Sequence, residues 1–433
     1  MKLTMPLLDY KDGFDFENDI FLRKNLSVQL ENIIRKSEDE SLVIALDDDW
    51  GNGKTTFLKM WEGEIIKNNE FQVVYFDAFQ NDFQSDPFIA LSSNIYKLVK
   101  DISLQKRYLE ATKKVGSILL KASAKIGISA LTLGLLKSTE IEELKDNVSD
   151  SLSSPIEQFI EDKIKSIEQE QETIEHFKLI LSEIAADKKL IFIIDELDRA
   201  RPNYSLELLE RIKHIFNTRN IYFILATNKQ QHLSIIQKTY GNIDANTYLC
   251  KFIHFWFKLP KTVNYMNNEH VIDKYANHVN NKLAGNAQHY KTSIDNLKVL
   301  LKINNCSLRD LERCFSLLML VNASTPSGFT WEYQVGISIL VYLKIKDEIT
   351  YNKIINNDIK TRNDLLTALN IQDIPTNRET YHIYLAANTE FMDDQTYNDL
   401  TKGNRNFVFD SLYGDRLKVI SEAIKLIENI SIE

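Results

Sequence analysis

One segment near the start of the chain constrains the fold more than any other feature of the sequence. Residues 41–46 (SLVIAL) form an apolar run, a polar turn with glycines at 51 and 53 follows, and the residues after Lys54 have helical apolar spacing. The glycines allow backbone N–H groups to turn inward, and the start of a helix adds its dipole at the same point. The segment therefore predicts a strand, an anion-binding loop and a helix, which is the context of a phosphate-binding loop.

The loop itself supplies candidate nucleotide ligands. Lys54 is expected to reach the β- and γ-phosphates, and the Thr55 hydroxyl is expected to ligate Mg²⁺. The sequence departs from the pattern G-x-x-x-x-G-K-[ST] at its first position, where Asp48 stands. With its two neighbours, Asp48 places up to three carboxylates before a site for a polyanion, so these either point away or act on metal and water. A plain glycine turn before a helix is the alternative. The expected nucleotide-binding residues of the loop are Trp50, Gly51, Asn52, Gly53, Lys54, Thr55 and Thr56.

A second half-motif ends a buried strand later in the chain. The apolar run Ile191–Ile194 leads directly into Asp195 and Glu196, and ligands of open α/β sheets bind at the carboxyl ends of strands. We expect Asp195 to hold Mg²⁺ through its waters, and Glu196 to orient and deprotonate the attacking water. A solvated acidic turn is the alternative, although two half-motifs in the right order argue against it.

Three further polar groups are candidates for the same site. Asn228, with Thr227 before it at the end of another apolar run, is expected to contact the γ-phosphate or the water, and a simple strand-ending turn is the alternative. Arg199 is a candidate for stabilising the transferring phosphoryl group, and an ion pair with Asp198 or Glu196 is the alternative. For Arg201 such an ion pair is the preferred interpretation. Arg309 follows the helix-capping Ser307 and is a candidate sensor of nucleotide across a domain interface, with a solvated charged helix as the alternative.

Strand patterns alternate with helical patterns up to about residue 262, which predicts a doubly wound, mostly parallel sheet of the α/β class. Residues 101–185 lack strand signals and predict a helical insertion, with a long helix beginning at Ser154. The expected domains are residues 1–100 and 186–262 for the two parts of the core, 101–185 for the insertion, and 263–433 for a mostly α-helical C-terminal domain. Strands are expected at 41–46, 71–76, 189–194, 221–226 and within 250–259, and helices at 87–100, 206–216, 294–303, 308–320 and 417–427.

Charge and cysteine content limit the partners and the compartment. The net charge of −9 gives no global positive field, so nucleic acid is not indicated by charge, although a local basic groove stays possible. Three scattered cysteines and a start without signal-peptide features favour a reducing, cytoplasmic setting. The most membrane-like stretch, 115–136, is interrupted by Lys121 and Lys125, so we expect a buried or interfacial helix and no integral membrane insertion. An amphipathic helix on a membrane surface is the alternative.

Four segments together resemble the KAP family of P-loop NTPases over about residues 20–320. They are WGNGKT at 50–55, VVYFDAFQND at 73–82, IFIIDELDR at 191–199, and YLCKFI at 248–253 before Leu259-Pro260. Because the insertion looks soluble, the chain is similar to the soluble bacterial branch.

The resemblance implies an additional-strand, AAA+-like core with the catalytic glutamate, here Glu196, on the Walker B strand. It implies nucleotide roles for Lys54, Thr55 and Asp195, and more loosely for Asp198, Arg199 and Arg309. Some family members look like components of defence against phage or plasmids, which is an expectation for the biological role here.

The leading hypothesis is a cytoplasmic ATPase that uses ATP and Mg²⁺, with Glu196, Lys54 and Arg199 as catalytic residues. Hydrolysis is expected to rearrange the helical regions against the core, within an oligomer or with a protein partner. The alternative, motivated by Asp48, is a nucleotide-gated scaffold with little hydrolysis that binds protein partners through its C-terminal helices. A nucleic-acid motor ranks third, because the basic and aromatic stretches Tyr265–Tyr290 and Lys344–Lys360 also carry compensating acidic residues.

Overall fold

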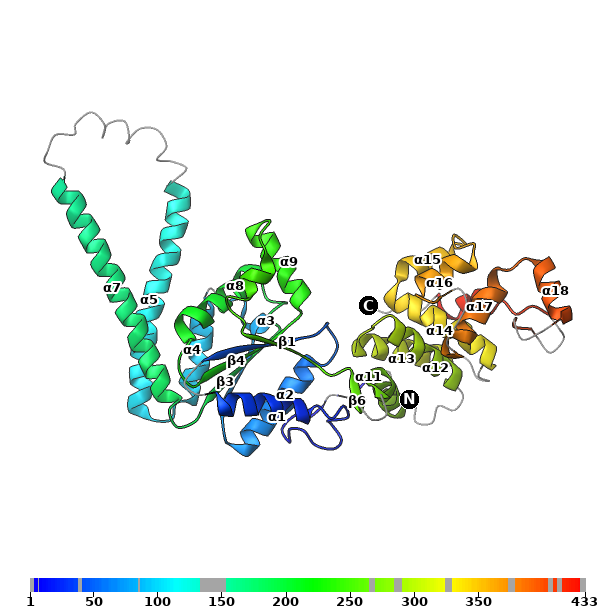
Figure 1. The fold of residues 1–433 in the computed structure, drawn as a ribbon, viewed down its shortest axis with the longest axis horizontal. Coiled ribbons are helices and arrows are strands. Elements are labelled where there is room, and N and C mark those ends of the chain that lie inside the picture. Colours follow the sequence, from blue (N-terminus) through cyan, green and yellow to red (C-terminus); the bar gives the residue numbers. More distant parts are fainter. Residues whose placement is uncertain are drawn as a thin grey trace, which may run out of the picture.

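The computed structural model describes residues 4–428 except 7, 38–40, 85, 133–152, 265–268, 284–289, 324–328, 373–377, 404–407 and 411–414. Within these residues the chain forms three parts, which Figure 1 shows side by side: a central α/β core, a long helical hairpin and a C-terminal group of helices. The membrane-like stretch 115–136 ends among residues 133–152, outside the described part.

The core is built on a parallel sheet of five strands. Its order is β2-β3-β4-β1-β5, and every neighbouring pair is parallel. β4 thus separates the strand before the phosphate loop, β1, from the strand that carries the acidic pair, β3, and this confirms the additional-strand, doubly wound prediction. The strands are β1 (Leu42–Asp47), β2 (Gln72–Asp77), β3 (Leu190–Asp195), β4 (Ile221–Thr227) and β5 (Phe255–Lys258).

Successive side chains of the strands point to opposite faces of the sheet, and helices pack against both faces. On one face, Ile44, Ile193 and Ile224 pack under α1 (Lys24–Lys36) and α2 (Lys54–Asn68). On the other face, Phe192 and Phe223 stack with ring centroids 4.9 Å apart. That second face is covered by α4 (Pro87–Leu98), α8 (Pro202–Arg211), the π-helical turn η1 (Ile212–Phe216) and α9 (Lys229–Tyr240). Central strands covered on both faces explain their nearly unbroken apolar sequences.

Two short elements differ from the expected pattern within the core. The stretch 250–259 is a strand only from Phe255, because Phe252 and Ile253 donate backbone hydrogen bonds to Leu249 O (both 3.0 Å) and prolong the turn after α10 (Ala245–Leu249). The helix expected at 206–216 begins earlier, at Pro202, and closes in the π-helical turn. The short helix α3 (Ala78–Asn81) follows β2, where the Asp77 side chain accepts from Gln80 N.

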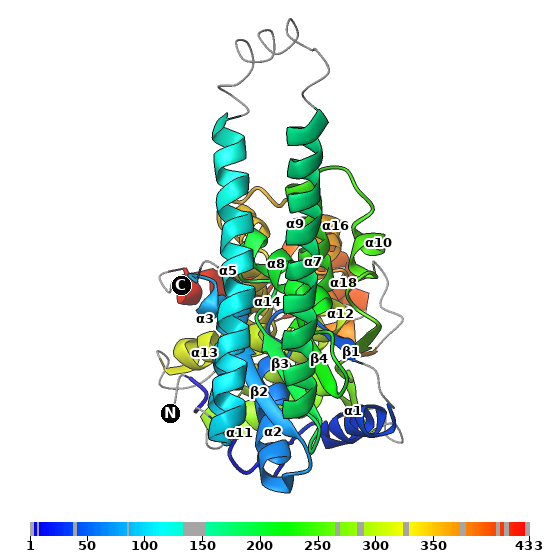
Figure 2. The ribbon, with the colours of Figure 1, turned by 90° about the vertical axis from the view of Figure 1, so that its left-hand side faces the viewer.

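The insertion between β2 and β3 is a helical hairpin. It consists of α5 (Ile102–Thr132) and α7 (Ser153–Ile184), which run side by side and extend well beyond the core in Figure 2. Its root is anchored because Tyr108 and Phe177 pack with Phe88 of α4 and Phe216 of η1. In the part of the chain that the structure describes, no helix combines the length and apolarity needed to cross a bilayer.

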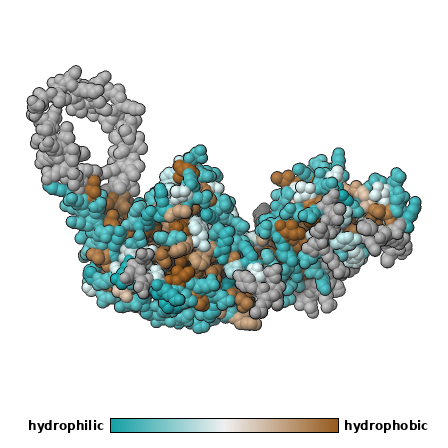
Figure 3. Space-filling model, viewed as in Figure 1, coloured by the Kyte–Doolittle hydropathy of each residue, from teal (hydrophilic) through white to brown (hydrophobic). Residues whose placement is uncertain are grey.

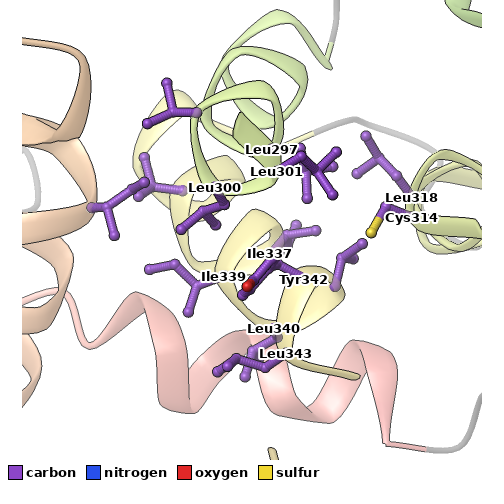
Figure 4. Close-up of a cluster of buried hydrophobic side chains, with 14 of the residues drawn as sticks. Leu297, Leu300, Leu301, Cys314, Leu318, Ile337, Ile339, Leu340, Tyr342 and Leu343 are labelled. Atoms are coloured by element: carbon purple, nitrogen blue, oxygen red, sulfur yellow. The ribbon is translucent and has the colours of Figure 1, made fainter. Parts of the chain in front are cut away.

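The C-terminal domain is helical apart from a two-stranded antiparallel sheet, β6 (Thr262–Asn264) and β7 (Glu269–His270), which the sequence did not predict. Its central helix is α14 (Trp331–Lys346), buried on all sides, and Figure 4 shows its Ile337, Ile339, Leu340 and Leu343 among side chains of the neighbouring helices. The helices α12 and α13 confirm the expected ones, and α19 confirms a helix near 417–427. The other helices are α11 (Val271–Leu283), α12 (Lys291–Ile303), α13 (Leu308–Ala323), α15 (Glu348–Ile355), α16 (Arg362–Ala368), η3 (Arg378–Thr380), α17 (Tyr381–Phe391), α18 (Asp394–Gly403) and α19 (Val419–Ile427).

Three apolar clusters lie within the described residues. One core lies within the C-terminal helices, and the others lie on the two faces of the sheet. The surface in Figure 3 is mostly hydrophilic, with hydrophobic side chains gathered over the middle of the core. α11 and α13 lie on the side of the core away from the hairpin (Figure 1), and they approach the phosphate loop. The predicted domain limits stay predictions.

Candidate nucleotide-binding site

A cavity of about 420 Å³ lies at the carboxyl edge of the sheet, between the core and the C-terminal domain. The phosphate loop after β1 and the acidic pair after β3 both line it. Of the residues expected from the sequence, those that line the cavity are Trp50, Gly51, Gly53, Lys54, Thr55, Thr56, Asp195, Glu196, Arg199 and Arg309. Residues separated by up to 259 positions in the chain are thereby brought to one site.

The loop has the geometry of an anion cradle. Gly51 (φ +86°) and Gly53 (φ +83°) both adopt the left-handed conformation that glycine tolerates at no steric cost. Gly53 caps α2, which begins at Lys54. The Lys54 ammonium donates to the backbone carbonyls of Asp48 and Asp49. Burial lowers the pKa of Lys54, while the nearby carboxylates Asp198 and Asp48 oppose that shift.

The three aspartates before the loop all have partners that hold them away from the cavity. Asp48 accepts from Asn52 Nδ2 (2.6 Å) and Lys261 Nζ (2.7 Å). Asp49 accepts from Asn228 Nδ2 (3.1 Å), and Asp47 accepts from the backbone N of Lys229 (2.9 Å). Of the two readings of these acids, the geometry favours the one in which they point away from the polyanion.

The acidic pair is oriented by hydrogen bonds from the neighbouring strand and from its own backbone. The Tyr75 hydroxyl of β2 donates to Asp195 Oδ2 (2.6 Å), and Glu196 N donates to Asp195 Oδ1 (2.9 Å). Glu196 itself has a φ of +56°, which is rare for a residue with a side chain and characteristic of strained functional sites. The backbone thus turns sharply at the point where the candidate base enters the cavity.

Glu196 is engaged in an ion pair. Its carboxylate lies 2.8 Å from Arg199 Nε, and the Arg199 guanidinium lies 5.6 Å from the centre of the Trp50 ring. The Trp50 indole in turn donates to Asp198 (2.6 Å), which also accepts from the backbone N of Asn228 (3.0 Å). The loop tryptophan therefore joins the phosphate loop, the acidic turn and the end of β4 in one network.

The pKa of Glu196 is raised by burial, and the guanidinium of Arg199 opposes the rise. Arg199→Ala removes the opposing charge and leaves burial together with Asp195 and Asp198, all of which raise the pKa of Glu196. If Glu196 is the base, the acid limb of the kcat profile is expected to move to higher pH in this variant. Arg201→Ala is the matched control, because Arg201 pairs with Asp82 (3.8 Å) and leaves the profile in place. An acid limb that does not move, or that moves to lower pH, would contradict the assignment.

Two of the expected residues do not line the cavity. The side chain of Asn52 is directed to Asp48 and to the backbone N of Leu308 (3.3 Å). Asn228 is buried, and its amide caps α9 and contacts Asp49. Their predicted contacts with nucleotide stay predictions. Arg201, expected in an ion pair with the acidic turn, is paired instead with Asp82, because its position at the start of α8 faces the end of β2.

The C-terminal domain contributes one wall of the cavity. Arg309, Tyr275, His278 and Glu312 line it from α11 and α13. Ser307 caps α13 as expected, because its hydroxyl accepts from Asp310 N (3.1 Å). Arg309 is exposed toward the cavity beside Gly51, where its backbone N donates to Gly51 O (3.2 Å). The position proposed for Arg309 at a domain interface thus agrees with the geometry.

Three site residues escaped the sequence reasoning. Tyr75 carries a signal in hindsight, since it is a hydroxyl within the apolar run of β2 two residues before its end. Arg23 caps α1 and donates to Asn52 O (3.1 Å), and burial lowers its pKa to about 10. Lys261 contacts Asp48 across 213 residues. Nothing in the local sequence of Arg23 or Lys261 marks them, because their roles depend on chain segments that meet only in the folded protein.

Two of the solved structures that are similar to the chain are both 11% identical to it in sequence. The Aeropyrum pernix ORC2 protein (ADPNP-ADP complexes) covers 94% of both chains with a TM-score of 0.35. The Aeropyrum pernix ORC1 protein in complex with DNA covers 97% of this chain and 95% of that chain with a TM-score of 0.32. A likeness at this level has no bearing on function.

The sequence comparisons are more informative. The Phage T7 exclusion protein of Escherichia coli (strain K12) is 22% identical over 273 residues, which are 58% of this chain and 34% of that protein. The chain therefore spans about a third of the length of this relative. Residues 23–325 match the KAP family P-loop domain, a range that holds the phosphate loop, the acidic pair and Arg309. The chain belongs to the KAP family of P-loop NTPases.

Proposed function

We propose that the protein binds ATP with Mg²⁺ and hydrolyses it at the cavity between the core and the C-terminal domain. One observation carries the proposal: Lys54 and Thr55 of the loop face the same cavity as Asp195 and Glu196. A phosphate-binding lysine and a Mg²⁺-binding hydroxyl at the start of α2, with a carboxylate and an acid of raised pKa at the end of β3, are the parts that in-line phosphoryl transfer to water requires.

Each residue has a role that follows from its chemistry. Lys54 exchanges its two backbone carbonyl acceptors for phosphate oxygens, and the loop N–H groups surround the same phosphates. The Thr55 hydroxyl and the Asp195 carboxylate suit Mg²⁺, which takes one or two protein oxygens and fills its other positions with phosphates and water. Glu196 leaves Arg199 and accepts the proton of the attacking water, after which Arg199 is available to the phosphates.

Part of the cavity lining supplies a surface for the base. Side chains of the N-terminal segment and α11 line the cavity together with the loop and the acidic turn; among them are Leu8, Tyr10, Ile20, Phe21, Tyr275 and His278. Apolar and aromatic side chains with few polar groups are typical of the part of a pocket that holds a flat ring. Adenine is the base proposed, and competition by GTP against labelled ATP tests that choice.

The proposal extends to the biological setting. Arg309 lies on the C-terminal domain and beside the loop, so hydrolysis is proposed to rearrange the helical regions against the core, in an oligomer or with a protein partner. The free thiols Cys250, Cys306 and Cys314 suit a reducing cytoplasm. The similarity to the Phage T7 exclusion protein supports a proposed function in bacterial defence against phage or plasmids.

The test is phosphate release from Mg²⁺-ATP by the wild type and by Glu196→Gln, with the mass of the protein in solution measured in parallel. Turnover that is present in the wild type and lost in a variant that still binds ATP supports the proposal. Wild-type protein that binds no nucleotide at all would overturn it.

A second candidate function is a nucleotide-gated scaffold that hydrolyses ATP too slowly to matter. The ion pair of Glu196 with Arg199 at 2.8 Å favours it, because a base held by a cation does not activate water. Asp48, which motivated this reading at first, no longer supports it, since its carboxylate is bound by Asn52 and Lys261. Tight ATP binding without turnover, together with partner binding that requires Lys54, would favour the scaffold.

Tyr75→Phe tests the role assigned to Asp195. The variant loses the hydroxyl that donates to Asp195 Oδ2 at 2.6 Å. The Mg²⁺ concentration that gives half-maximal turnover is expected to rise by roughly 10- to 100-fold, the usual effect of removing a group that orients a metal ligand. Tyr222→Phe on β4 is the control, because its hydroxyl donates to Ser37 O (3.2 Å) at the other end of the sheet. An unchanged Mg²⁺ requirement in Tyr75→Phe would argue against Asp195 as the metal-binding group.

A further inference from the structure

Asp48 stands where phosphate loops commonly carry glycine, and its carboxylate is buried rather than exposed to the cavity. The side chain is 4% exposed. It accepts from the backbone N of Asp49 (2.8 Å), from Asn52 Nδ2 (2.6 Å) and from Lys261 Nζ (2.7 and 3.0 Å). A buried carboxylate is tolerated only where such donors surround it, so the three donors and Asp48 stabilise one another.

Lys261 connects this carboxylate to the C-terminal domain. It lies in the linker between β5 and β6, and its backbone carbonyl accepts from the N of Val271 (2.9 Å), the first residue of α11. A single linker residue thus bonds the phosphate loop through its side chain and the first helix of the C-terminal domain through its backbone.

Asn52 provides a second connection from the same carboxylate. Its Nδ2 donates to Asp48, while its Oδ1 accepts from the backbone N of Leu308 (3.3 Å). The next N–H of α13, that of Arg309, donates to Gly51 O (3.2 Å). The first N–H groups of a helix have no partner within the helix, and here the phosphate loop supplies partners for two of them.

We propose that Asp48 is a positioning residue, which ties the phosphate loop to the linker and to α13 so that phosphate binding and the placement of Arg309 are linked. The proposal rests on the proposed function of the cavity. The link acts through Lys54, whose ammonium donates to the backbone carbonyl of Asp48. When Lys54 turns to a phosphate, the backbone carbonyl of Asp48 loses its donor. The backbone therefore adjusts at Asp48, whose side chain binds Lys261 and Asn52.

A double-mutant cycle on nucleotide affinity tests the link. Arg309→Ala is expected to weaken the binding of a fluorescent ATP analogue with Mg²⁺ roughly tenfold, as the loss of a charged hydrogen bond does. In the Lys261→Met background Asp48 loses the cation that helps to hold it, so the loop groups that bond α13, Asn52 Oδ1 and Gly51 O, are fixed less firmly. The same change is there expected to cost at least about threefold less, which is the non-additivity of coupled residues.

Lys258→Met is the matched control variant. Lys258 lies three positions earlier in the chain, its side chain is 79% exposed, and it lies 4.0 Å from Asp47. Arg309→Ala is expected to have its full effect in this background. Equal effects of Arg309→Ala in the Lys261→Met and Lys258→Met backgrounds would overturn the proposal.

A second measurement needs no nucleotide. Hydrogen exchange in the peptide that covers residues 305–313 is expected to speed up in Lys261→Met and in Asp48→Asn, and not in Lys258→Met. The reason is that Asn52 Oδ1 and Gly51 O, which accept from the N–H groups of Leu308 and Arg309, are held less firmly once Asp48 loses a partner. Exchange unchanged by all three substitutions would overturn the proposal. Faster exchange in a protein whose wild type binds no nucleotide would leave the connection standing and overturn the proposed function of the cavity instead.

Discussion

Glu196→Gln is expected to lower the rate of phosphate release by roughly 10²- to 10⁴-fold, the usual contribution of a general base. Glutamine keeps the size of the side chain but cannot take the proton of the attacking water. ATP affinity is expected to persist, because the residues proposed to bind phosphate are Lys54, Thr55 and the loop N–H groups. Lys54→Ala gives the opposite pattern, in which affinity itself is lost. Single-turnover phosphate release and equilibrium binding of ATP, measured on the same preparations, separate the two patterns.

Glu207→Gln is the matched control for this substitution. Glu207 is another partly buried glutamate whose pKa is raised by burial, but it lies on α8 outside the cavity. It is expected to leave turnover unchanged. Full turnover in Glu196→Gln would refute the assignment of the base, and a loss of nucleotide binding in the same variant would mean that Glu196 serves the structure of the site instead.

Gly51→Ala is expected to destabilise both the loop and its contact with the C-terminal domain. A Cβ at this position would lie 2.7 Å from Arg309 Cβ and 2.9 Å from Ser307 Oγ, on a backbone with φ +86°. The left-handed conformation costs roughly 1–2 kcal/mol for a residue with a side chain, and the overpacking adds about 1–3 kcal/mol. The urea midpoint and the ATP affinity are both expected to fall.

Gly241→Ala separates these two contributions. Gly241 has a φ of +79°, but a Cβ there would meet nothing within 4 Å. It therefore carries the conformational cost without the clash. The free energy of unfolding of Gly51→Ala is expected to lie about 1–3 kcal/mol below that of Gly241→Ala. Equal losses in the two variants would show that the contact between the loop and α13 contributes nothing to stability.

The core of the fold could be predicted from the sequence because its signals are local. An apolar run such as Ile191–Ile194 followed by two acids identifies both a buried strand and the edge at which it ends. The expected strands at 41–46 and 189–194 therefore predict that the phosphate loop and the acidic pair lie at the same edge of the sheet. The additional strand came from the family resemblance, and the observed order β3-β4-β1 confirms it.

What escaped prediction depends on contacts between distant segments or on weak periodicity. α14 carries apolar residues on all sides, so its sequence has no polar face to indicate a helix. The partners of Asp48 could not be predicted, because Lys261 lies 213 positions away and no pattern links the two. Arg199 is a different case, because its ion-pair partner Glu196 lies only three positions earlier in the chain.

A small tilt at the root of the hairpin corresponds to a large displacement of its far end. α7 has 32 residues, and at 1.5 Å per residue it is about 48 Å long. Its root packs on α4 and η1, next to the strands that deliver the acidic pair. A tilt of about 10° at that root carries the far end of the helix through about 8 Å. The length of the hairpin therefore means that a tilt of only about 10° at its root corresponds to a displacement of several ångströms at its far end.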